Sequence, residues 1–82
     1  AERRFLVQQL EWREALEEAG TPDRVDALAA EMQEQRQALF ARLETLLDQD
    51  HDYAAAARVV RALMFVERFA HDVDERREAL GQ

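Results

Sequence analysis

The sequence predicts an all-α fold, a three-helix antiparallel (up-down-up) bundle. Helix-forming residues dominate the 82-residue chain, with 15 Ala against two Gly and one Pro. Turn signals cluster in only two places, and apolar residues recur at helical spacing between them. Each helix therefore has an apolar stripe to bury against the other two. The length predicts a single domain, residues 1–82.

The first helix is predicted at residues 2–19. Phe5, Trp12, Leu16 and Ala19 fall on one side when each residue advances the helix by about 100°. Gly20 follows directly and is expected to act as the glycine that ends this helix.

The second helix is predicted at residues 22–48, with Thr21 as its N-cap and Pro22 in its first position. Its apolar stripe is expected to face the core. The stripe consists of Val25, Leu28, Met32, Leu39, Leu43, Leu46 and Leu47.

The third helix is predicted at residues 52–79, after a break rich in aspartate. Asp50 or Asp52 would cap its N-terminus. The predicted core stripe consists of Ala56, Val59, Val60, Leu63, Val66, Ala70 and Val73.

The composition argues against several classes of partner. The formal charge is −7, from 18 acidic and 11 basic residues, whereas nucleic acids and anionic membranes require a basic surface. A basic patch on another protein suits this charge better. The sequence lacks cysteine, a signal peptide and an apolar run of the ~20 residues that span a membrane, so we expect a cytoplasmic setting. Because the helical pattern begins at Ala1, we also expect a piece of a longer protein.

No catalytic residue, metal site or cofactor is predicted. Asp48, Asp50 and Asp52 have the spacing that begins a calcium loop, but Tyr53 and Val59 stand where that loop needs Gly and Glu. Two histidines 20 residues apart form no ligand pair, and the sequence has neither serine nor a glycine-rich phosphate loop. The sequence therefore does not predict an enzyme.

The first helix carries residues that the core does not explain. Leu6, Val7 and Leu10 point more than about 100° away from its core stripe. A row of glutamates at i, i+3 and i+7 runs beside them: Glu11, Glu14 and Glu18. An apolar patch rimmed by like charge is typical of a protein-recognition surface. The alternative is that Leu6 and Leu10 widen the core stripe and that the acidic residues form an ordinary solvated face.

Phe65 is a similar misfit on the third helix, about 130° from the centre of its stripe. With a rise of 1.5 Å per residue, Leu6 and Phe65 both lie about 20 Å along the bundle. Because the first and third helices run parallel, we expect Leu6, Leu10 and Phe65 to share one exposed patch. Replacing these residues would then leave folding nearly intact.

Two segments resemble those of a known family. The first, residues 5–18, reads FLVQQLEWREALEE; the second, residues 53–65, contains YAAAA (53–57) and VRALMF (60–65). In order and spacing they resemble the F-L-x-x-Q-L-E-x-R-E-x-L segment and the aromatic, Ala-rich, V-R-x-L-x-F segment of the HscB-type J-protein co-chaperones of iron–sulfur cluster assembly. The resemblance covers nearly the whole chain.

The resemblance implies a C-terminal domain that binds the scaffold protein on which clusters are built (IscU in bacteria). An N-terminal J-domain would recruit the chaperone HscA, but its His-Pro-Asp signature is absent from these 82 residues. Two positions depart from the family pattern: Val7 replaces a longer Met, and Trp12 replaces an aliphatic residue. The implied scaffold-contacting residues are Leu6, Val7, Leu10, Glu11, Glu14, Glu18 and Phe65.

A structural module remains the alternative from another class. The same patch could bind a second copy of the chain, which would make this a helical homodimerisation domain with no chaperone role.

Overall fold

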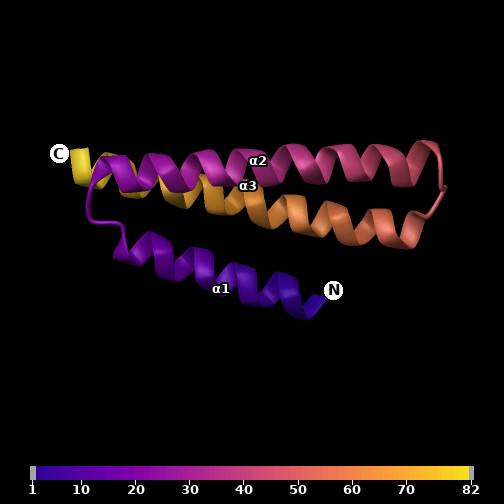
Figure 1. The fold of residues 1–82 in the computed structure, drawn as a ribbon, viewed down its shortest axis with the longest axis horizontal. Helices are drawn as coiled ribbons and strands as arrows, with labels where there is room; N and C mark the ends of the chain where they lie inside the picture. Colours follow the sequence, from indigo (N-terminus) through magenta and orange to yellow (C-terminus); the bar gives the residue numbers. More distant parts are fainter. Residues whose placement is uncertain (1, 82) are drawn as a thin grey trace.

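The computed structural model describes residues 2–81, and the side chains of residues 3–81. Three helices follow one another: α1 (Glu2–Glu18), α2 (Pro22–Asp48) and α3 (Tyr53–Gly81). Within this range there is no strand. Figure 1 shows α2 running back along α1 and α3 running parallel to α1, which confirms the predicted up-down-up arrangement.

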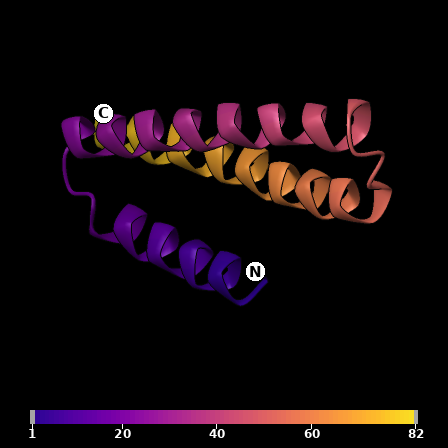
Figure 2. The ribbon, with the colours of Figure 1, turned by 45° about the vertical axis from the view of Figure 1, so that its right-hand side comes forward.

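The three helices are not packed equally. α2 and α3 form a long antiparallel hairpin that holds most of the contacts between helices. The C-terminal end of the shorter α1 lies near this hairpin, and α1 diverges from the hairpin toward its own N-terminus (Figures 1 and 2). The C-terminal end of α1 therefore packs closely against the hairpin, and its N-terminal end lies farther away.

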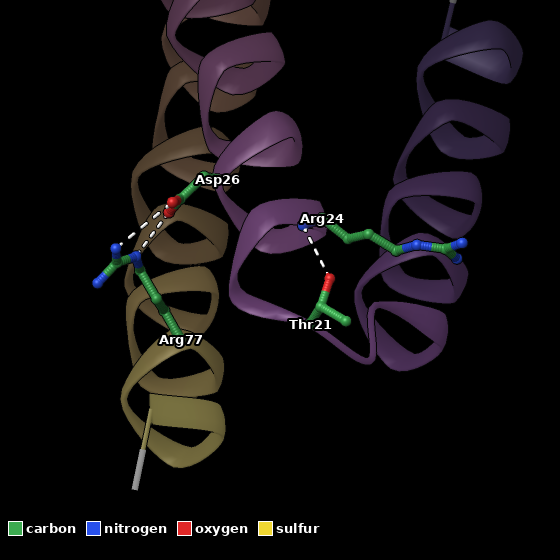
Figure 3. Close-up of polar contacts among 4 residues, drawn as sticks. All are labelled: Thr21, Arg24, Asp26 and Arg77. Carbon is green, nitrogen blue, oxygen red and sulfur yellow. Dashed lines mark hydrogen bonds and ion pairs between the residues drawn. The ribbon is translucent and has the colours of Figure 1, made fainter.

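The break before α2 has the predicted chemistry. Thr21 is extended (φ −136°, ψ 152°), and its hydroxyl accepts a hydrogen bond of 3.3 Å from the Arg24 backbone N–H (Figure 3). Pro22 occupies the first turn, where its missing N–H costs nothing.

The end of α1 differs from the prediction. Gly20 does not have a positive φ, so it is not the left-handed glycine that often closes a helix. The Arg76 guanidinium from α3 instead donates to the backbone carbonyls of Glu17 (3.4 Å) and Ala19 (3.3 Å). A positive group at these carbonyls also interacts favourably with the negative end of the helix dipole. A side chain 57 residues away along the chain thus caps α1.

At the second break the capping residue is Asp52, whose carboxylate accepts a hydrogen bond of 3.1 Å from the Ala55 N–H. His51 takes the left-handed conformation there (φ 51°). Of the three aspartates suggestive of a calcium loop, Asp48 ends α2, and Asp50 and Asp52 lie in the connection to α3.

The buried side chains form two clusters. One joins all three helices and contains Trp12, Ala19, Val25, Leu28, Met32, Val66, Phe69 and Val73. The other joins only α2 and α3 and contains Leu46, Ala55, Ala56, Val59 and Leu63. All three helices therefore contribute to the core near the α1–α2 connection, whereas only α2 and α3 contribute to it at the other end.

Two core predictions are wrong. Leu47 and Val60 are 39% and 43% exposed, and Val60 lies just outside the buried arc of α3. That arc extends instead to Ala62 and Phe69, on the side where Phe69 stacks against Trp12 of α1. The predicted stripe left out Ala62 and Phe69, which lie on the α1 side of the arc, and included Val60 on its other side.

Exposed ion pairs also join α2 to α3. Arg77 donates to Asp26 over 2.6 Å (Figure 3), and Arg36 pairs with Glu67. The hydrogen bond from Arg77 lowers the pKa of Asp26 below its ordinary value of 3.8. Because folding lowers the pKa of Asp26, the pair stabilises the fold fully at a pH above the ordinary pKa of this carboxyl. That stabilisation is lost as the pH falls through the lower, folded-state pKa.

We predict that Trp12→Ala lowers the free energy of unfolding by about 3–5 kcal/mol, because Trp12 is 4% exposed in the cluster that joins all three helices. Circular dichroism should report a predominantly helical chain that melts cooperatively without metal. Met64→Ala is the control, since Met64 is 57% exposed, and it should change stability by less than about 0.5 kcal/mol. A loss below about 1 kcal/mol for Trp12→Ala would contradict the assigned core.

Candidate functional site

The outer face of α1 presents an apolar patch. Leu6, Val7 and Leu10 are 59%, 50% and 61% exposed, so they do not widen the core stripe. Phe5 and Trp12, about 100° or more away around the same helix, face α3 and contact Phe65. The misfit found in the sequence thus corresponds to a helix with one buried side and a second, exposed apolar side. We call Leu6, Val7 and Leu10 the α1 patch.

An acidic row adjoins the α1 patch. Glu11, Glu14 and Glu18 are all exposed and lie on the same side of α1 as Val7 and Leu10. None forms an ion pair with the described side chains of residues 3–81. Their carboxylates are therefore available to basic groups of a partner.

Phe65 lies at the predicted level but is less exposed than predicted. Its ring packs edge-on against Phe5 at 5.7 Å between centroids, which places it beside the segment that carries the α1 patch. It also stacks on Trp12 (6.0 Å, 3° between planes) and on Phe69 (5.8 Å). Phe65 is thus partly buried, at the edge of the core cluster.

The physical reason is the position of α1. Phe65 points away from the stripe that faces α2 because it points toward α1, where Phe5 and Trp12 receive it. The expectation that Phe65 is an exposed member of one patch with Leu6 and Leu10 is corrected accordingly. We call Phe5, Trp12, Phe65 and Phe69 the aromatic cluster. It lies between α1 and α3, on the side of α1 away from the α1 patch.

A groove that the sequence analysis missed borders the patch. It lies between the N-terminal half of α1 and the α2–α3 hairpin and has a volume of about 430 Å³. Leu6 belongs to both the patch and the groove wall. The lining residues are Phe5, Leu6, Leu39, Arg42, Ala55, Arg58, Val59, Arg61 and Ala62. The i, i+3 spacing of Arg58 and Arg61 placed two arginines on one face of a helix, but the divergence of α1 was not visible in the sequence.

The described residues offer little to other chemistries. They contain no group of three or more His, Cys, Asp or Glu side chains placed to hold a metal ion. None of the described helices is both long and apolar enough to cross a membrane. His71 contacts Glu75 at 3.0 Å on the surface, and both side chains are exposed.

Comparison with known proteins gives the chain its relatives. The profile of the family described as "HSCB C-terminal oligomerisation domain" matches residues 1–74. No solved structure matches the chain.

The curated relatives are named co-chaperone protein HscB homologs. The protein from Burkholderia multivorans is 48% identical over 79 residues, and that from Aromatoleum aromaticum is 43% identical over 79; each alignment covers 93% of this chain and 45% of the relative. The protein from Bordetella petrii is 47% identical over 76 residues, which are 92% of this chain and 45% of that protein. The chain thus spans a little under half the length of these relatives. With a matching profile over residues 1–74 and identities of this size, the chain belongs to the family of HscB C-terminal domains.

Proposed function

We propose that this chain is the protein-binding domain of a co-chaperone, and that it holds an IscU-like iron–sulfur cluster scaffold protein for delivery to the chaperone HscA. The observation that carries the proposal is the α1 patch, three large apolar side chains that are each at least half exposed on one helix. Membership in the HscB family supports the choice of partner, because the family's relatives bear the name of a co-chaperone. Residues 1–82 would act as one scaffold-binding unit.

The chemistry of the surface defines the roles of its residues. Leu6, Val7 and Leu10 would supply the apolar contacts that carry most of the binding energy. Glu11, Glu14 and Glu18 would attract basic groups of the scaffold and orient it. Phe65 would contribute the exposed edge of its ring and would also hold α1 at the right level through the aromatic cluster.

Self-association is the second candidate function. It is favoured by the description of the matching family as an oligomerisation domain. The same α1 patch would then be buried against a second copy. Light scattering separates the two functions, because a monomer leaves the patch available to another protein.

We predict that Leu10→Ala weakens binding to the scaffold by about 2 kcal/mol or more and leaves the thermal melt nearly unchanged, because Leu10 is 61% exposed. Phe65→Ala should weaken binding too, but it should also destabilise the fold by roughly 2 kcal/mol or more, because it removes three aromatic contacts. Binding is measured by calorimetric titration well below the melting temperature of each variant.

Met64→Ala is the matched control for Leu10→Ala, since Met64 is 57% exposed on another helix. It should bind like the wild type. If Leu10→Ala unfolds the chain as severely as Trp12→Ala, the patch belongs to the core. If Leu10→Ala stays folded and binds normally, the site lies elsewhere.

We predict that the triple change of Glu11, Glu14 and Glu18 to Gln slows association with the scaffold and makes it less dependent on salt, because rim charges act mainly on association rates. The control is the same change at three exposed acids of α2, Glu31, Glu34 and Glu44, which alters the net charge equally. Stopped-flow kinetics at several salt concentrations measures both. Equal effects of the two triple variants would show that only net charge matters.

We predict that this chain alone does not accelerate ATP hydrolysis by HscA, because its 82 residues contain no His-Pro-Asp. It should instead compete with an intact HscB co-chaperone for the scaffold. A steady-state ATPase assay with the intact co-chaperone as the positive control tests this. Stimulation comparable to that control would overturn the proposed division of roles.

A further inference from the structure

The groove between α1 and the α2–α3 hairpin has an apolar floor. Leu39 of α2 and Val59 of α3 lie in it together with two alanines of α3, Ala55 and Ala62. The small alanine side chains leave room where α1 has already diverged from the hairpin (Figure 2). The opening thus follows from the anchoring of α1 at its other end.

Three arginines surround this floor. Arg58 and Arg61 lie one helical turn apart on α3, and Arg42 comes from α2. All three are exposed, and none forms an ion pair with the side chains described for residues 3–81. By contrast, Arg36 and Arg77 on the same hairpin are paired with carboxylates of the neighbouring helix.

The charge of the groove opposes that of the whole chain. A protein with a formal charge of −7 gathers three of its 11 basic residues at one apolar groove. Guanidinium groups bind carboxylates through paired hydrogen bonds, and beside an apolar surface these bonds gain strength. The complement of this groove is therefore an apolar segment that carries acidic residues.

We propose that the groove is a second part of the binding surface, which receives an acidic and apolar segment of the scaffold protein. This inference rests on the proposed function, because it takes the scaffold as the partner. Leu6 lines the groove and also belongs to the α1 patch, so one bound protein can cover both.

The α1 patch, the acidic row and the groove together then form one surface with a negative end and a positive end. Glu11, Glu14 and Glu18 lie toward the C-terminal end of α1, and the arginines lie beside its N-terminal half. A partner that covers both must present basic groups at one end and acidic groups at the other. Reversing such a partner brings like charges together, so this arrangement sets its orientation. A second copy of the chain is a poorer occupant, because two chains of −7 repel each other.

The first test uses the sign of a rate change. Arg58→Gln combined with Arg61→Gln removes two positive charges, which takes the formal charge from −7 to −9. The matched control is Arg24→Gln combined with Arg68→Gln, two exposed arginines that do not line the groove and whose removal changes the charge equally. Association with the IscU-like scaffold is measured by stopped flow.

We expect the groove pair to slow association by roughly threefold to tenfold, while the control pair leaves it within about twofold. The opposite result, equal or faster association for the groove pair, means that the facing surface is neutral or basic and overturns the proposal. Melting curves of both pairs confirm that each variant is folded.

The second test locates the segment directly. Since the sequence has no cysteine, Arg42→Cys provides a unique attachment point for a photo-crosslinker at the groove, and Glu14→Cys provides one at the acidic row. We expect the groove probe to crosslink to a scaffold peptide rich in Asp or Glu and apolar residues. Three results overturn the groove proposal alone: the groove probe crosslinks to a second copy, it crosslinks to a basic peptide, or it gives no crosslink while the Glu14→Cys probe does. Failure of both probes to reach the scaffold overturns the proposed function as well.

Discussion

The indole of Trp12 is the contact on which the arrangement of the three helices depends. It is almost fully buried and stacks on both Phe65 and Phe69 of α3. In the same cluster lie side chains of α2, including Val25 and Leu28. Most of the stability of a helix in a protein comes from tertiary packing, and contacts of this kind supply it to the 17-residue α1. Trp12 makes two aromatic contacts with α3 from a single position.

This anchoring lies toward the C-terminal end of α1, and its position explains the rest of the surface. Arg76 caps the carbonyls at that end, and Ala19 is buried beside them. Toward the N-terminus Phe5 contacts α3, through its edge-on packing against Phe65. The helix can therefore diverge from the hairpin (Figure 1), and the groove lies where it does so.

The sequence predicted the elements well because their signals are local. Thr21 and Pro22 mark the start of α2 through their own backbone chemistry, and the structure places that start as predicted. The three exposed residues of the α1 patch were also identified, because their direction on the helix depends only on the 3.6-residue period.

The remaining features depend on which helix lies next to which. The periodicity of α3 could say that Phe65 lies off the main stripe, but not whether it faces solvent or a third helix. Likewise, Gly20 suggested a left-handed cap, whereas a distant arginine performs that function. The groove has no sequence signature at all, since it is the space left by an angle between helices.

Under the proposed function, recognition and stability would depend on opposite sides of the same short helix. A fully packed α1 would bury more apolar area, at about 25 cal/mol per Å², and would make the bundle more stable. It would also close the groove and cover Leu6, which lines it. Concentrating the attachment in Trp12 and its aromatic neighbours allows a small core to fix the helix while its outer face stays unpaired. Phe65 joins the two sides, because its ring supports the helix from within and lies directly behind the segment that would meet the partner.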